Sequence, residues 1–196
     1  MRIEPVTLNG DRVVMEPLDL DDVGQLCDFG LSEEVWRWTV NKIANESEMR
    51  SYVESALSDQ KKGTSLPFAT KLLDSDKIVG SSRFGNIDIV NRKVEIGWTW
   101  VDPSWQRSFV NTEAKLLMLT HAFEVWDCVR VEFKTDALNE SSRNAILRLG
   151  ATEEGTLRNH MITNSGRFRD SVYFSIIIEE WERVKAGLVQ KLGRHQ

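Results

Sequence analysis

The fold is decided by residues 94–126, which read VEIGWTWVDPSWQRSFVNTEAKLLMLTHAFEVW. Apolar side chains recur at every second position from Val94 to Trp100 and are β-branched or aromatic, which predicts a strand with these side chains on one face. Pro103 ends the strand. Beyond it, apolar residues at helical spacing predict a helix that begins near Asn111 or Thr112. These residues are Leu116, Leu119, Phe123 and Trp126.

The polar loop that enters this helix is a candidate anion site. The first backbone N–H groups of a helix have no partner inside it, and the helix dipole places partial positive charge there. A phosphate suits such a helix end.

Outward from this stretch, periodicity and turn signals predict the chain order β-α-α-β-β-β-α-β-α-β-β-α. The central strand and the strand 129–135 are predicted to be parallel, through a right-handed crossover over the long helix. With no linker, repeat or low-complexity segment, residues 1–196 are predicted to form a single α/β domain. The other predicted strands are 12–18, 66–73, 77–87, 156–163 and 168–178, and the other predicted helices are 19–30, 45–63, 139–150 and 179–192.

Several ordered motifs resemble one family. WQRSFVNTEAK at 105–115 resembles the acyl-CoA pyrophosphate loop of the GCN5-related N-acetyltransferases (GNAT), in particular the branch resembling ribosomal-protein-alanine N-acetyltransferases (RimJ/RimL-like). The resemblance covers about residues 8–181. It implies a mixed, mostly antiparallel sheet with a splayed central parallel strand pair, flanked by helices. Supporting motifs are EIG at 95–97, NESS at 139–142, RLGA at 148–151, LRNHM at 157–161 and the stretch 166–175.

The loop departs from the family pattern at two positions. Phe109 and Asn111 stand where the family has small residues, so the Phe109 ring must point away from any phosphates bound there. Asparagine tolerates the left-handed region and caps helices readily. The guanidinium of Arg107 could form charge-assisted bonds to a pyrophosphate in place of close backbone approach.

The resemblance also implies an acetyl-CoA site in the wedge between the splayed strands. Acyl transfer needs a neutral amine, a stabilised carbonyl oxygen and a proton for the departing sulfur. Ser142 is the candidate donor of that proton, and Glu95 is the candidate base or ammonium-binding group. Asn139 and Ser142 are equally typical of a helix N-cap and first turn, and Glu95 of a solvated strand face. The implied cofactor-binding residues are Trp100, Val101, Gln106, Arg107, Ser108, Phe109, Val110, Asn111, Thr112 and Asn139.

Four residues indicate the acceptor side. Arg158 and His160 lie on a predicted strand where the family lines the acceptor mouth, and Trp36 and Trp38 could line an acceptor pocket. A strand histidine is more often packed or exposed than catalytic. Two tryptophans near a helix end are more often part of the core, so both interpretations stay open.

Composition disfavours other classes of protein. The net charge is −5 and no run of Lys and Arg is present, which disfavours a nucleic-acid surface. No window approaches the ~20 apolar residues of a membrane span, and the N-terminus has no apolar signal core, so a cytoplasmic protein without membrane contact is expected. Cys27 and Cys128 are expected to be buried and reduced. His121 and His195 lack metal-type neighbours, so no metal is expected.

The sequence therefore predicts an acyl-CoA-dependent N-acetyltransferase that moves an acetyl group from acetyl-CoA to a primary amine by direct attack in a ternary complex. The acceptor is left open between a protein N-terminus and a small amine, and a homodimer is also left open. The alternative is a CoA-binding sensor or interaction module on the same fold without transfer activity, which Phe109 and Asn111 would favour.

Overall fold

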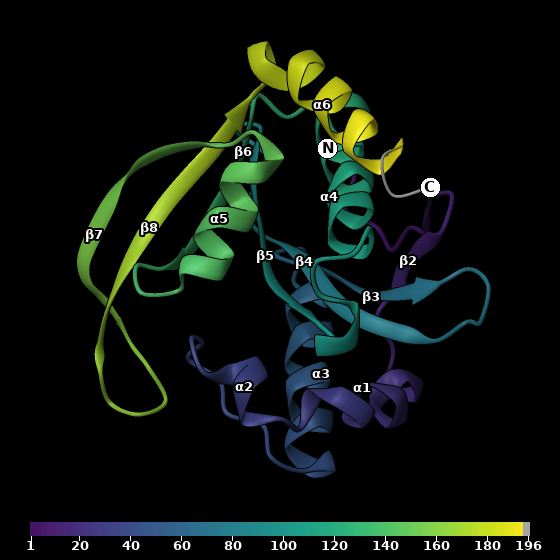
Figure 1. Cartoon of the computed structure of the whole chain (residues 1–196), viewed down its shortest axis with the longest axis vertical. Coiled ribbons are helices and arrows are strands. Elements are labelled where there is room, and N and C mark those ends of the chain that lie inside the picture. Colours follow the sequence, from purple (N-terminus) through teal and green to yellow (C-terminus); the bar gives the residue numbers. More distant parts are fainter. Residues whose placement is uncertain (194–196) are drawn as a thin grey trace.

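An eight-stranded sheet runs through residues 1–193, the part of the chain that the computed structural model describes (Figure 1). All neighbouring strands are antiparallel except the parallel pair β5–β6, in the order β1-β2-β3-β4-β5-β6-β8-β7. This confirms the predicted fold class, a mixed and mostly antiparallel sheet with one central parallel pair. His195 lies outside the described residues. The strands are β1 (Leu8–Asn9), β2 (Val13–Pro17), β3 (Leu66–Leu72), β4 (Ile78–Asp88), β5 (Lys93–Val101), β6 (Arg130–Asp136), β7 (Thr152–Ile162) and β8 (Phe168–Ile177).

Helices cover both faces of this sheet (Figure 1). They are α1 (Val23–Gly30), α2 (Glu33–Trp36), α3 (Glu46–Lys61), α4 (Val110–Thr120), which continues as a π-helical turn at His121–Val125, α5 (Glu140–Leu149) and α6 (Trp181–Gly193). Apolar residues of α1–α3 form one core cluster, which includes Trp100. Those of α4–α6 form a second cluster, which includes Val94 and Ile96. Within residues 1–193, no helix has both the length and the hydropathy of a membrane span.

The element order agrees with the predicted order, with β1 and α2 as additions. α4 begins at Val110, slightly before the predicted start, and the hydroxyl of Ser108 accepts a hydrogen bond from the Val110 amide at 3.2 Å. α5 ends before Gly150, as predicted. Gly150 has φ of +104°, a left-handed conformation that glycine adopts without strain.

β5 contains a bulge that reverses its side-chain alternation. Trp98 and Thr99 stand together opposite Ser82 of β4, and Trp98 has φ of +50°. One extra residue moves the following side chains to the other face of the sheet. Ile96 accordingly packs with α4–α6, whereas Trp100 packs with α1–α3. The prediction that these side chains share one face is therefore wrong beyond Ile96.

Glu113, in the first turn of α4, holds the N-terminal β1–β2 hairpin. Its buried Oε1 accepts hydrogen bonds from the amides of Asp11 at 2.6 Å and Arg12 at 2.9 Å. The Arg12 Nε lies 3.4 Å from Oε2. Because β1 and β2 flank these amides, the carboxylate fixes the hairpin against the helix that follows the loop.

Glu113→Gln is expected to lower the free energy of unfolding by about 1–2 kcal/mol, because hydrogen bonds to a charged acceptor are roughly twice as strong as neutral ones. Urea denaturation followed by circular dichroism measures this change. Glu54→Gln, at an exposed position of α3, is the matched control. Equal midpoints for the two variants would show that the charge of Glu113 does not hold the hairpin.

Candidate active site

The parallel pair β5–β6 separates after three residue pairs. Residues 93–95 of β5 pair with residues 130–132 of β6. Beyond these, β5 continues to Val101 along β4, and β6 continues to Asp136 along β8. The facing edges of the two strands are unpaired backbone there, which is the splay that the family resemblance implies.

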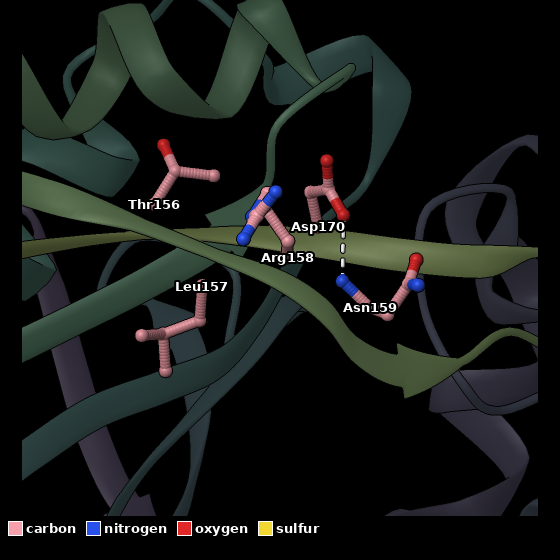
Figure 2. Close-up of a pocket in the computed structure, with 5 residues that line it drawn as sticks. All are labelled: Thr156, Leu157, Arg158, Asn159 and Asp170. Carbon is pink, nitrogen blue, oxygen red and sulfur yellow. Dashed lines mark hydrogen bonds between the residues drawn. The ribbon is translucent and has the colours of Figure 1, made fainter.

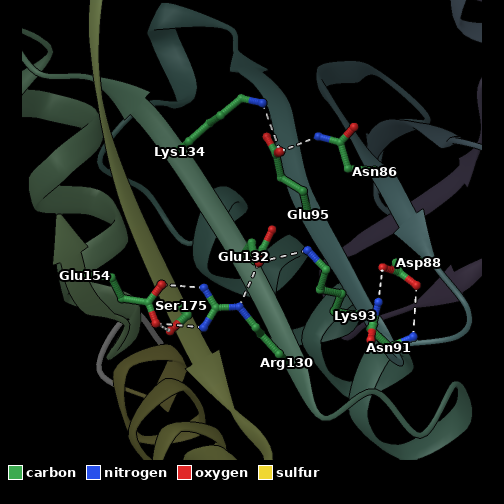
Figure 3. Close-up of polar contacts among 10 residues, drawn as sticks. All are labelled: Asn86, Asp88, Asn91, Lys93, Glu95, Arg130, Glu132, Lys134, Glu154 and Ser175. Carbon is green, nitrogen blue, oxygen red and sulfur yellow. Dashed lines mark hydrogen bonds and ion pairs between the residues drawn. The ribbon is translucent and has the colours of Figure 1, made fainter. Parts of the chain in front are cut away.

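A network of ion pairs holds the paired end of these strands (Figure 3). Arg130 on β6 donates to Glu132 at 2.8 Å and to both carboxylate oxygens of Glu154 on β7. Lys93 on β5 lies 3.4 Å from Glu132, and Ser175 on β8 donates to Glu154 at 2.8 Å. The hydrogen bonds from Arg130 lower the pKa of Glu154 to about 2. The strands are therefore tied at this end, before they separate.

The loop between β5 and α4 leaves backbone amides available at the start of the helix. The amide of Val110 is bonded to Ser108. The amides of Asn111 and Thr112 lie in the first turn, where no intrahelical partner exists. Arg107 is exposed, has φ of +60° and makes no ion pair within residues 1–193. Two amides and one guanidinium are thus available to an anion.

The side chain of Phe109 packs toward β2 and points away from the start of α4. Its ring centroid lies 4.0 Å from the guanidinium carbon of Arg12, and its ring meets that of Trp105 edge-on at 5.9 Å. It also joins a small apolar cluster with residues of β2, β3 and β4. On the other side of the loop, Gln106 donates to the Val101 carbonyl at 3.4 Å. The ring therefore has the orientation that phosphate binding requires.

Lys115 is buried one turn further along α4. Its Nζ donates to the hydroxyls of Ser82 at 2.7 Å and Thr99 at 2.6 Å, and no carboxylate within residues 1–193 pairs with it. Burial lowers the pKa of Lys115 to about 7. The amine joins α4 to the bulge of β5 and to β4, so it positions the strand where the two central strands separate.

Glu95 lies on the face of β5 that α1–α3 cover, because Val94 and Ile96 point to the other face. It is only 3% exposed, and Oε2 accepts hydrogen bonds from Asn86 at 2.7 Å and Lys134 at 3.0 Å (Figure 3). Oε1 has no hydrogen-bond partner within residues 1–193. The interpretation as a solvated face residue is therefore wrong: one oxygen is fixed and the other is available.

Asn139 and Ser142 lie at the start of α5, near the end of β6. Oδ1 of Asn139 accepts a hydrogen bond from the Ser142 amide at 3.0 Å, so its helix-cap role is confirmed. The hydroxyl of Ser142 is half-buried and has no hydrogen-bond partner in the described chain. It is free to donate, and the cofactor contacts of both residues stay predictions.

The two tryptophans of the acceptor prediction lie in different surroundings. Trp36 is buried among α1–α3, donates to the Gly30 carbonyl at 2.6 Å and meets Tyr52 edge-on. Trp38 is half-buried under Arg37, 4.9 Å from ring centroid to guanidinium carbon. Trp36 is thus part of the core, and Trp38 lies in the loop that follows α2.

Arg158 and His160 lie on β7, and Arg158 lines a hollow of about 680 Å³ (Figure 2). Leu157 points to one side of this strand, and Asp170 of β8 accepts a hydrogen bond from the Asn159 amide at 2.7 Å. His160 is exposed and its Nδ1 lies 3.0 Å from the Ser171 hydroxyl. The structure does not bring Arg158 or His160 into contact with Glu95.

The end of the β7–β8 hairpin contacts the loop after α2. Asn164 donates to the Asn41 carbonyl at 2.6 Å, and Arg169 donates to the Trp38 carbonyl at 3.3 Å. Arg169 also lies 4.0 Å from Asp136, a fully buried carboxylate at the end of β6. These contacts close the α1–α3 side of the candidate site with segments that are far apart in sequence.

Two buried cations, Lys115 and Arg83 of β4, were missed by sequence reasoning. Periodicity identifies faces through apolar residues, so a single cation on such a face leaves no pattern.

Of the cysteines, Cys128 is buried, with its pKa raised to about 12 by burial, and Cys27 is half-buried; neither forms a disulfide. Within residues 1–193, no three His, Cys, Asp or Glu side chains are grouped so that they could hold a metal ion.

Comparisons with known proteins agree with this geometry. The family model described as "Acetyltransferase (GNAT) domain" matches residues 12–152. "Putative ribosomal N-acetyltransferase YdaF" of Bacillus subtilis (strain 168) is 29% identical over 88% of this chain and 93% of its own. A GCN5-related N-acetyltransferase from Brucella melitensis has a TM-score of 0.89 at 29% identity, over 96% of this chain and 86% of its own. Mycobacterium smegmatis RimJ in complex with CoA-disulfide has the same fold, with a TM-score of 0.81 at 24% identity, over 97% and 96%.

Proposed function

The chain belongs to the acetyltransferase (GNAT) domain family and is an N-acetyltransferase, and from this premise we propose that it moves an acetyl group from acetyl-CoA to a primary amine by direct attack in a ternary complex. The observation that carries the proposal is the start of α4: two first-turn amides lack partners, and the one bulky side chain of the loop is packed toward β2. The thioester supplies the acetyl group when it is bound.

The residues of the loop and the splayed edge fit the donor. The amides of Asn111 and Thr112, with the guanidinium of Arg107, would hold the pyrophosphate. The unpaired backbone of β5 near Trp100 would bond the pantetheine arm, with Asn139 on the opposite side. The splay supports this placement, because hydrogen-bonding groups of β5 beyond Glu95 have no strand on their β6 side.

Glu95 and Ser142 would handle the protons. Glu95 Oε1 would take a proton from the amine, directly or through a water, while the new C–N bond forms and the C–S bond breaks. The hydroxyl of Ser142 would give a proton to the departing sulfur and would take one back from solvent. Both assignments are supported by atoms that have no partner within the described residues.

The acceptor is a protein N-terminus or a small amine. The name of the Bacillus relative favours a ribosomal protein. A cavity of about 430 Å³ against α3 favours a small molecule, because ligand pockets typically have this size. The orientation of Phe109 away from the start of α4 supports donor binding over the sensor alternative, while Asn111 remains the second departure that motivated the sensor.

Two measurements test the proposal. Isothermal titration with acetyl-CoA is expected to show one binding site per chain, and thiol release in the presence of an amine panel is expected to show transfer. Absence of heat at millimolar acetyl-CoA would contradict donor binding. Binding without thiol release by any peptide or small amine would favour the sensor.

Ser142→Ala is expected to reduce kcat about 10-fold while it leaves acetyl-CoA affinity within about 2-fold, because the hydroxyl assists only the departing sulfur. Steady-state kinetics and titration separate these effects. Ser141→Ala, at the exposed neighbouring position, is the control. Unchanged kinetics in Ser142→Ala would return Ser142 to the role of a first-turn polar residue.

A further inference from the structure

Arg83 is buried on the same sheet face as Glu95 and has no charged partner. It is 5% exposed, Nε and Nη2 are enclosed without a hydrogen-bond acceptor, and no carboxylate within residues 1–193 pairs with it. An unpaired guanidinium inside a protein is strongly unfavourable. A buried arginine without a partner in the chain is typical of a site at which the anionic partner is a bound ligand.

Two aromatic rings hold this guanidinium. Its carbon lies 4.8 Å from the ring centroid of Tyr52 on α3 and 5.4 Å from that of Trp98 on β5. Rings against a guanidinium face restrain its plane and leave its edge for hydrogen bonds. Nη1, unlike Nε and Nη2, is not among the fully enclosed atoms. Nη1 can therefore receive an oxygen of a carboxylate, a charge-assisted hydrogen bond.

A polar cavity lies against Arg83. Its volume is about 430 Å³, and α3 contributes Tyr52 and the serines 47, 51 and 55 to its wall. Residues four positions apart share a helix face, so the hydroxyl groups form one stripe along this wall. A wall of this kind suits a small polar ligand.

The carboxylates of this cavity are already engaged. Glu48 accepts a hydrogen bond from the Ala44 amide at 2.7 Å, and Asp59 pairs with Lys62 at 3.0 Å. Lys42 adds a second positive charge to the lining. An incoming anion therefore meets Arg83 without a competing carboxylate of the chain.

Arg83 on β4 is a diagonal cross-strand neighbour of Glu95, the candidate base, on β5. Glu95 pairs with Gly85, two residues along β4 from Arg83. Diagonal neighbours on one sheet face are about 7–8 Å apart, which a small bifunctional molecule can span. The Trp98 ring lies close to Arg83 and also to Lys134, which donates to Glu95. The anion site and the free oxygen of Glu95 are thus parts of one surface.

We propose that the acceptor is a primary amine that also carries a carboxylate, with the carboxylate bound by Arg83 and the amine directed to Glu95. This inference rests on the proposed function and adds to it the charge that the acceptor carries. A free amino acid and a peptide with an acidic first residue share this chemistry, and the experiment distinguishes them.

The test compares acceptors that differ only in the carboxylate. Glycine, β-alanine and 4-aminobutyrate are each assayed against their amides, and amidated peptides that begin with Asp are assayed against those that begin with Asn. At least one acid is expected to exceed its uncharged partner in kcat/KM about 30-fold or more, the lower range for a lost partner of a buried charge. Preference confined to the free acids identifies a small acceptor, and preference confined to peptides identifies an N-terminus. Equal rates in every pair would overturn the inference and leave the proposed function intact.

Arg83→Met is expected to bring the acid-to-amide ratio close to 1 and to leave the thermal midpoint equal or higher, since an unpaired buried charge is removed. A structural arginine would instead lower the midpoint without changing the ratio, and that result would overturn the inference. Arg83→Lys keeps a charge but lacks the guanidinium plane that the rings of Tyr52 and Trp98 restrain, so its ratio is expected to fall about 10-fold. An unchanged ratio in Arg83→Lys would also count against it. Arg50→Gln, exposed on α3, is expected to behave as the unchanged protein.

A binding assay separates this site from turnover. N-acetylglycine and N-acetylglycinamide, which lack a primary amine, are titrated against the complex with CoA. Tighter binding of the acid to the unchanged protein, with loss of that difference in Arg83→Met, supports the carboxylate site even if no amine is acetylated. Equal binding of acid and amide by the unchanged protein would overturn it.

Discussion

Glu95→Gln is expected to lower kcat/KM for acetyl transfer about 100-fold, the lower range for loss of a general base. Glutamine keeps the size of the side chain and can still accept the hydrogen bonds from Asn86 and Lys134. It cannot take a proton from the amine. Acetyl-CoA affinity is expected to be unchanged, because Glu95 lies on the sheet face that α1–α3 cover and the loop that precedes α4 is elsewhere.

Glu132→Gln is the matched control for this prediction. Glu132 is in register with Glu95 on the neighbouring strand, but it contacts Lys93 and Arg130 at the paired end. Steady-state kinetics across pH measure both variants. At each pH, kcat/KM is expected to fall in Glu95→Gln and to stay close to that of the unchanged protein in Glu132→Gln. A reduction below about 3-fold in Glu95→Gln would assign proton removal to solvent.

Lys115→Met is expected to raise the free energy of unfolding by about 3 kcal/mol at pH 7, within the range measured when buried ions are replaced by apolar residues. The hydroxyls of Ser82 and Thr99 lie 2.7 Å apart, so they can bond to each other once the amine is removed. The buried amine therefore destabilises the fold. Its contact with the β5 bulge suggests that it is retained for the geometry of that strand.

Stability is also expected to depend on pH through Lys115. Burial lowers its pKa in the folded protein from 10.5 to about 7, so the unfolded chain binds more protons between these two pH values. The free energy of unfolding must then rise with pH through this window, by at most ~5 kcal/mol, and Lys115 adds no slope below it. Denaturant unfolding between pH 6 and pH 9 measures the slope. Lys115→Met is expected to flatten it, and Lys61→Met, exposed on α3, is expected to retain it. If the unchanged protein, Lys115→Met and Lys61→Met all show the same slope of unfolding free energy against pH, groups other than Lys115 are responsible for it.

The sequence predicted most elements because their signals are local. The Thr-Glu-Ala run and the apolar stripe placed α4 within two residues of its observed start, and Asn139 gave the cap of α5. The bulge at Trp98 was missed because it depends on pairing with β4, which a period of two along β5 does not contain. Trp98 and Trp100 were consequently assigned to the wrong face.

The candidate site was predicted only in part for a similar reason. The loop at 105–112 has a motif and a helix start, so its amides could be placed from sequence. Arg83 and Lys115 are single cations whose surroundings come from strands and helices 15 to 33 residues away. Their burial depends on tertiary packing, which neither composition nor periodicity describes.

The contact between the β7–β8 hairpin and the loop after α2 has a consequence for how related chains can diverge. Both of its hydrogen bonds end on main-chain carbonyls, those of Trp38 and Asn41, whereas the donors are the side chains of Arg169 and Asn164. Substitution at positions 38 and 41 leaves the accepting oxygens in place. The side chains at positions 38 and 41 can therefore differ among related chains, and the selectivity of the site with them, while both hydrogen bonds are retained.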